Sequence, residues 1–263
     1  VNLLLKGSLI FLVVSSIGPF ALGYLKASGF KNHSLQQNAI YFYLHFQLNG
    51  FMQLALLGLF FKNYLKSNMP ISHVNAFWTK VLMISTLPLY AMFTLWTHPS
   101  VWVYILTFLA ALAHLLSWLV LILRLKADLK PLSFLTTIAL IAICLQFVFQ
   151  MLIAIPAIGN WVFESHNLII GYIHLLTLGS LSPLIIDLFI KAGYLKPSVK
   201  LNYLFVTAIL IYLVLLFGSA FLGAFQIYIP HLNILLFASN LALPFIGLGY
   251  FLNINSTVKI DLG

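Results

Sequence analysis

Apolar runs of about 20 residues make up most of this chain, and that is the length a helix needs to cross a bilayer core of ~30 Å. Of 263 residues, 62% are hydrophobic and only 6% are charged, whereas soluble domains carry about a quarter charged residues. The mean hydropathy is +1.07. A membrane β-barrel would show short alternating segments instead. The predicted fold class is all-α, a polytopic membrane protein.

The apolar runs predict eight transmembrane helices joined by short linkers. The linkers carry turn formers such as Ser28-Gly29 and Lys196-Pro197-Ser198, and none is long enough for a soluble domain. The chain 1–263 is therefore expected to form a single transmembrane helical domain. Its expected spans are roughly 3–25, 38–61, 76–97, 101–125, 131–155, 164–190, 201–225 and 231–254.

Basic residues distinguish the two sides of the membrane. Eight crossings put both termini on one side, and eleven Lys or Arg residues fall there, whereas only Lys26 and Lys31 fall on the other side. Because cytoplasmic loops carry such an excess, both termini are predicted to be cytoplasmic, in a bacterial inner membrane. These loop ends account for the formal charge of +9, so no nucleic-acid partner is expected. The expected partners are the lipid bilayer and other membrane subunits or a redox partner.

A spacing pattern in the second span recurs in the sixth. His45 is followed after four residues by Gly50-Phe51 and later by Gly58, and His166 is followed at the same spacing by Gly171-Tyr172 and Gly179. The two histidines lie four spans apart. The pattern predicts two four-helix repeats, with halves at about 1–130 and 131–263.

Polar residues form a stripe in the second span. His45, Asn49 and Gln53 recur every four residues, so they share one face of a helix that is otherwise apolar. At bilayer depth such groups need partners inside the protein, so the stripe is expected to face other helices or a bound group. Gln146 and Gln150 share a face of the fifth span and are expected to bind between helices.

Most of the eight histidines fall in the outer half of the expected topology. Neutral imidazole is a common ligand of haem iron and of copper, and two histidines on facing helices can hold a haem. His45 and His174 agree best in depth and are the preferred cofactor-binding pair, with His114 and His166 as substitutes. His45 is also the candidate metal ligand. The alternative is that each histidine only hydrogen-bonds a neighbouring helix.

Two further expectations concern neighbouring residues. The glycines that follow His45 and His166 are expected to leave a flat place for a porphyrin edge, lined by aromatic side chains such as Phe46 and Tyr172. Asp187, at the cytoplasmic end of the sixth span, is expected at the surface near Lys191, four residues later.

The stretch His45-Phe46-Gln47-Leu48-Asn49-Gly50-Phe51-Met52-Gln53 resembles the sixth-helix motif of nitric oxide reductase large subunits, in the haem-copper oxidase superfamily. The resemblance implies a metal-binding role for His45, and it places Asn49 and Gln53 where that family has glutamates. The stretch 171–179 looks like the tenth helix of the family, which implies haem binding by His174. The resemblance also extends to a haem-protein family linked to nitric oxide tolerance, in which a histidine precedes a glycine and an aromatic residue in similar fashion.

This sequence departs from the family in ways that bear on activity. No adjacent histidine pair completes a three-histidine metal site, and eight spans fall short of the family's twelve, as though the first four-helix unit were absent. Because both glutamates of the motif are amides here, no terminal reductase activity is expected.

Three functions remain open at this point. The first is a haem-binding electron-transfer component on a haem-copper oxidase-like scaffold, with haem b as its cofactor. The second is a cofactor-free structural or assembly subunit of a larger membrane complex. The third is a small-solute transporter, suggested by the repeat and by prolines within the spans.

Overall fold

The computed structural model describes residues 2–66 and 73–255. Within them the chain is helical, with two isolated β-bridges and no strand. Eight helical segments are long and apolar enough to cross a membrane, which confirms the all-helical, multi-pass prediction. They cover Asn2–Ala27, His33–Tyr64, Asn75–Thr97, Val101–Asp128, Phe134–Ile153, His166–Lys191, Val199–Ala224 and Leu232–Leu252.

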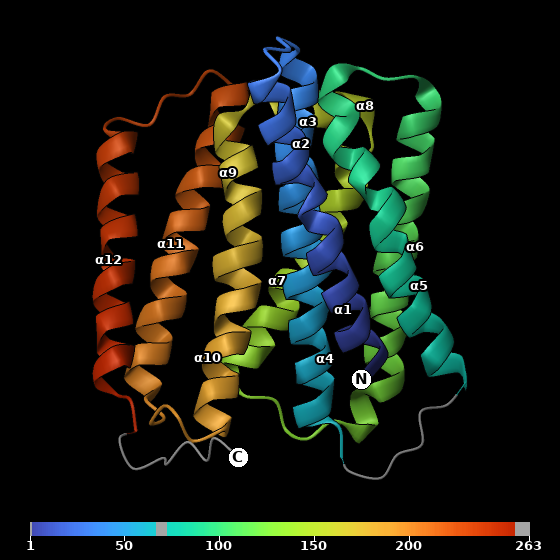
Figure 1. Cartoon of the computed structure of the whole chain (residues 1–263). Coiled ribbons are helices and arrows are strands. Elements are labelled where there is room, and N and C mark those ends of the chain that lie inside the picture. Colours follow the sequence, from blue (N-terminus) through green and yellow to red (C-terminus); the bar gives the residue numbers. More distant parts are fainter. Residues whose placement is uncertain (1, 67–72, 256–263) are drawn as a thin grey trace. The chain divides into compact units, whose positions relative to one another are not determined.

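The chain divides into two compact units (Figure 1). Unit 1 comprises Val1–Pro131 and Cys144–Phe163, and unit 2 comprises Leu132–Ile143 and Glu164–Gly263. The division passes through α7 (Phe134–Ile153), whose second part belongs to unit 1.

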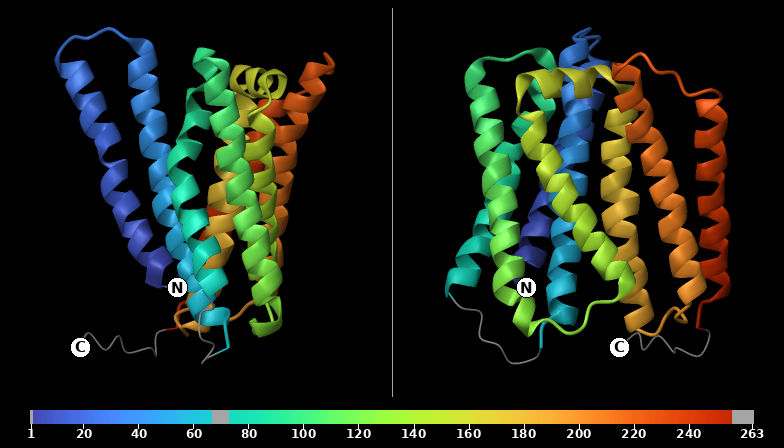
Figure 2. Two further views of the ribbon diagram at one scale, coloured as in Figure 1. Left: turned by 90° about the vertical axis from the view of Figure 1, so that its right-hand side faces the viewer. Right: turned by 180° about the vertical axis from the view of Figure 1, so that it is seen from behind.

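Unit 1 holds the first four spans. In this unit α5 packs along α6, α2 packs against α3, and α1 packs against η1 and α4. Figure 2 shows the α2–α3 hairpin from the side. The helices are α1 Asn2–Ser15, α2 Ile17–Ala27, α3 His33–His45, η1 Phe46–Met52, α4 Gln53–Tyr64, α5 His73–Leu89, η2 Tyr90–Thr97, α6 Val101–Leu125, η3 Lys126–Asp128 and the short α8 Pro156–Glu164.

Prolines explain where the first and third spans change their helical geometry. A proline lacks an N–H group, and its ring clashes with the carbonyl group four residues earlier. Accordingly, α1 ends at Ser15, four residues before Pro19. The helix α5 contains Pro88 and gives way after Leu89 to the 3₁₀ helix η2.

Unit 2 holds the last three spans and the first part of α7. Its helix α11 lies between α9 and α12 (Figures 1 and 2). The helices are α9 His166–His174, η4 Leu175–Leu181, α10 Ser182–Lys191, α11 Val199–Ala224 and α12 Leu232–Leu252.

In unit 1, two backbone hydrogen bonds tie the end of the second span to the end of the fourth. The N–H group of Lys66 donates to the carbonyl oxygen of Asp128 at 2.9 Å, and that of Lys130 donates to Tyr64 at 2.7 Å. An isolated antiparallel bridge lies between these bonds. The first two membrane hairpins are thereby joined at one edge.

In unit 2, the same arrangement ties the end of the sixth span to the end of the eighth. The N–H group of Lys196 donates to the carbonyl oxygen of Asn253 at 3.0 Å, and that of Asn255 donates to Tyr194 at 2.9 Å. An isolated antiparallel bridge again lies between them. Each unit therefore has two of its spans joined at their ends by a pair of backbone hydrogen bonds around an isolated bridge.

The short helix α8 lies between the fifth and sixth spans, where the sequence predicted only a short linker. Gly159 lies inside it, and its N–H group donates to the carbonyl oxygen of Ile155 at 2.8 Å. A Cβ atom at Gly159 would lie 2.6 Å from the carbonyl oxygen of Ile153. The glycine thus permits the sharp change of direction between α7 and α8.

Candidate functional site

The second and sixth spans each contain a π-helix that begins immediately after a histidine. In unit 1, α3 ends at His45 and η1 covers Phe46–Met52. In unit 2, α9 ends at His174 and η4 covers Leu175–Leu181. Such π-helical turns are rare and are frequent at functional sites.

The π-helices indicate which histidines correspond to each other. A glycine stands five residues after the histidine in both cases, Gly50 after His45 and Gly179 after His174. His166, which the sequence pattern pairs with His45, is instead the first residue of α9 and is exposed. In local structure, His174 and not His166 has the position that His45 has, immediately before a π-helix.

Both ring nitrogens of His45 have hydrogen-bond partners. Its Nε2 lies 2.8 Å from the carbonyl oxygen of Thr86 on α5, and its Nδ1 lies 3.4 Å from the side-chain nitrogen of Asn49. Because a carbonyl oxygen only accepts, Nε2 carries the proton and Nδ1 accepts from Asn49. The ring is completely buried. For His45 to bind a metal or haem iron, one of these hydrogen bonds must break.

The polar stripe meets the fifth span inside unit 1, as expected. The side-chain oxygen of Asn49 accepts from Gln146 at 2.7 Å and from Gln150 at 3.3 Å. Gln53 donates to the side-chain oxygen of Gln146 at 3.0 Å. All four side chains are buried. The stripe therefore faces α7, and its amides are bonded within the protein.

His114 on α6 joins this region through α5. Its Nδ1 lies 2.8 Å from the hydroxyl oxygen of Ser85, the residue before Thr86. The Ser85 hydroxyl donates its hydrogen to the carbonyl oxygen of Leu82 at 3.1 Å. Nδ1 of His114 is therefore protonated, and its N–H group donates to the Ser85 oxygen. The electron pair then lies on Nε2, the nitrogen that commonly binds metals.

Ser85 and Thr86, which bond His114 and His45, were not predicted from the sequence. The available signal was a pair of hydroxyl residues in an otherwise apolar third span. It says nothing about the main-chain carbonyl of Thr86, which is the atom that holds His45.

Aromatic rings surround His45. The rings of Phe46, Phe93 and Tyr90 have centroids 4.8, 5.2 and 6.0 Å from that of His45. Phe42 packs edge-on against both Phe46 and Tyr90. These ring contacts, together with its two hydrogen bonds, favour one orientation of the His45 imidazole.

The glycines do not leave the open recess that the sequence suggested. A Cβ atom on Gly50 would lie 2.8 Å from Cβ and Cγ of Phe11, which packs there from α1. A Cβ atom on Gly171 would lie 3.1 Å from the ring of Phe217 on α11. At both positions the absent side chain makes room for a neighbouring phenylalanine, so the expectation of a flat place for a porphyrin edge is wrong.

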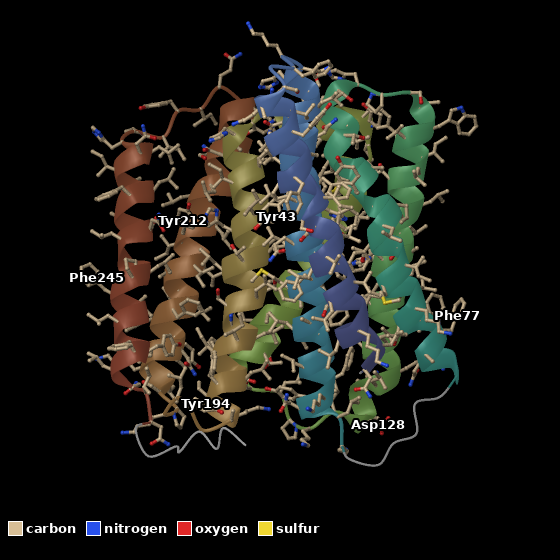
Figure 3. All side chains as sticks on the ribbon, viewed as in Figure 1. Tyr43, Phe77, Asp128, Tyr194, Tyr212 and Phe245 are labelled. Atoms are coloured by element: carbon tan, nitrogen blue, oxygen red, sulfur yellow. The ribbon has the colours of Figure 1, made fainter. Side chains whose placement is uncertain are left out.

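His174 is bonded differently from His45. Its Nδ1 lies 2.8 Å from the carbonyl oxygen of Ile170, one turn earlier in α9, and therefore carries the proton. Its ring packs edge-on against Tyr212, labelled in Figure 3, at 5.2 Å between centroids. With Nδ1 as the donor, the electron pair lies on Nε2. Nε2 of His174 could therefore hold haem iron, since a backbone carbonyl commonly orients a metal-binding histidine in this way.

Asp187 corrects a prediction about the surface. Its side chain is buried, and its carboxylate accepts a hydrogen bond from the hydroxyl of Thr136 at 2.9 Å within unit 2. The i, i+4 spacing to Lys191 suggested an exposed pair, but the position of α7 encloses the carboxylate.

No group of three or more His, Cys, Asp or Glu side chains with metal-binding geometry occurs among residues 2–66 and 73–255. His45 therefore stands among amides and aromatic rings.

The chain matches no protein-family model, no curated protein and no solved structure.

Proposed function

We propose that this chain is a haem-binding electron-transfer component of a bacterial inner-membrane complex, on a scaffold derived from the haem-copper oxidase architecture. The observation that carries the proposal is the bonding of His174. Its Nδ1–H donates to the carbonyl oxygen of Ile170, which leaves the Nε2 electron pair for a ligand. A bound haem b would supply one-electron chemistry, and His174 would hold it through Nε2.

The other histidines have different roles in this proposal. His114 has the same tautomer as His174 and is the next candidate ligand, because its Nδ1–H is held by Ser85. His45 keeps its place in the predicted pair only if one of its two hydrogen bonds, to Thr86 or to Asn49, opens. In the bonded state His45 orients the amides of the polar stripe. His166 is exposed at the start of α9 and is the least suitable of the four.

We also propose that the chain consists of two four-helix repeats with both termini on the cytoplasmic side. The matching links at the ends of spans two and four, and of spans six and eight, support the repeat. The histidine followed by a π-helix in both halves supports it further. The excess of basic residues at those ends supports the orientation.

The test is the visible spectrum of the full chain, expressed in bacterial membranes with a supply of haem and purified in mild detergent. A b-type spectrum that changes on adding dithionite is expected. His174→Ala should remove haem from the protein, whereas the matched control His166→Ala should retain it. Size-exclusion profiles show whether each variant is folded. A wild-type protein without haem, or a folded His174→Ala variant with full haem content, contradicts the proposal.

His45→Ala tests the predicted pair. If His45 also holds the haem, its removal should lower haem content as much as His174→Ala does. If it only orders the polar stripe, the variant should keep its haem and lose stability.

A second candidate is a cofactor-free structural or assembly subunit of a larger membrane complex. Two observations favour it: both ring nitrogens of His45 are hydrogen-bonded within the protein, and Phe11 packs against Gly50. The protein's own groups thus occupy the places where a cofactor would bind in unit 1. This candidate predicts a colourless purified protein that migrates with partner subunits on native gels.

A further inference from the structure

The last helix of unit 2 has an unusual outer surface. Helix α12 packs along α11, and most of its side chains are exposed. Phe245, labelled in Figure 3, projects from the side that faces away from α11. Exposed apolar side chains are expected where a helix meets lipid. Contact with lipid does not explain why Asn233, Asn240 and Gly247, which have no apolar side chain, are also exposed on α12. These three residues lie in one row.

This row repeats every seven residues. Asn233, Asn240 and Gly247 are all exposed, and so are the residues four positions after each of them, Phe237, Pro244 and Phe251. Residues at these spacings lie along one flank of a helix, as in the seam between two packed helices. We call these six residues the Asn240 row: Asn233, Phe237, Asn240, Pro244, Gly247 and Phe251.

Asn240 is the residue that needs a partner. It lies two residues from Ala242, the middle of α12, which is about 3 Å along the helix axis. Its side chain has no hydrogen bond to any part of the chain that the structure describes, and it is exposed. A primary amide at the centre of a bilayer finds no water and no acceptor in the lipid chains. Another protein surface is the partner that relieves this cost.

The chemistry of the amide favours a second copy of this chain. An asparagine side chain has both donors and an acceptor, so two of them can bond reciprocally across a two-fold axis. A charged side chain at this position would instead repel its own copy and would need a partner of opposite charge on a different protein. Two copies in the same membrane orientation also bring their α12 helices together in parallel, so that equal positions meet.

Gly247 provides the space for that approach. A Cβ atom added there would meet nothing within 4 Å, so the backbone is accessible from outside. Small residues next to a polar group are typical of helix pairs in membranes, because they let the backbones come close. We propose that the Asn240 row of α12 is a homodimer interface, in which the Asn240 side chains of two copies hydrogen-bond to each other.

Disulfide cross-linking in native membranes tests the proposal. Cys144 is the only cysteine, and its half-buried sulfur accepts a hydrogen bond from Trp118, so Cys144→Ala gives a cysteine-free background. Gly247→Cys in that background should form a covalent dimer on oxidation. The control Phe245→Cys, which is also exposed but lies roughly 140° around the helix from Asn240, should not.

Asn240→Leu tests the amide itself. In the native chain, this variant should raise the dissociation constant of the dimer about tenfold, as measured by fluorescence transfer in diluted proteoliposomes. A tenfold change is the effect of losing one or two membrane hydrogen bonds. The control Phe245→Leu should leave dissociation unchanged. Equal cross-linking at 245 and 247, no dimer at 247, a covalent adduct with another protein, or unchanged dissociation of Asn240→Leu would each overturn the proposal.

Discussion

Asn49 joins three other buried side chains of unit 1, so its removal should be more costly than that of a typical polar residue in a membrane helix. Its Oδ1 atom accepts from Gln146 at 2.7 Å and from Gln150 at 3.3 Å, and its Nδ2 atom lies 3.4 Å from Nδ1 of His45. Asn49→Ala removes all three bonds. The 2.7 Å bond has the best distance, and the other two are near the limit of hydrogen bonding.

The expected loss follows from these distances. A hydrogen bond between membrane helices contributes about 0.6 kcal/mol on average and up to about 1.7 kcal/mol. Assigning the upper value to the short bond and smaller values to the long ones gives a destabilisation of about 2 kcal/mol. Asn63 provides a matched control in the same span, because its exposed side chain only donates to Leu59 of its own helix. Asn63→Ala should leave the free energy of unfolding almost unchanged.

The assay is reversible unfolding in mixed detergent micelles, followed by tryptophan fluorescence. A double-mutant cycle with Gln146→Ala should give a coupling free energy of about 1 kcal/mol, because both changes remove the same short bond. Equal stability of the Asn49→Ala and Asn63→Ala variants would refute the reasoning. So would additive effects of Asn49→Ala and Gln146→Ala.

Two pairs of variants test the packing within each unit. Gly18→Ala should destabilise unit 1 by about 1–3 kcal/mol, because its Cβ would lie 2.6 Å from the backbone oxygen of Ala39; Gly23→Ala in the same helix, with nothing within 4 Å, should be neutral or stabilising. In unit 2, Asp187→Asn should lower the melting temperature less than Asp187→Leu, because only the amide can still accept from the Thr136 hydroxyl. Thermal unfolding in detergent measures both pairs; a harmless Gly18→Ala or the reverse order at Asp187 would contradict the packing described.

The eight spans follow from the sequence because length and apolarity set the crossings before any tertiary contact forms. Each expected range overlaps an observed helix. The shared face of Gln146 and Gln150 was equally predictable, since four-residue spacing places side chains together on any helix. The haem-binding pair, the two repeats and the membrane orientation remain proposals for experiment.

Which atoms meet within the site depended on helices far apart in the sequence. His45 bonds to a backbone oxygen of α5, and a main-chain carbonyl has no signature in the sequence. Gly50 looked like an open space until Phe11 from α1 filled it, and Asp187 looked exposed until α7 covered it. The sequence alone determined which segments lie in the membrane, because that depends on the transfer of each segment from water to lipid. Only the tertiary structure decided the partners of each polar group, because a partner is set by the packing of one helix against another.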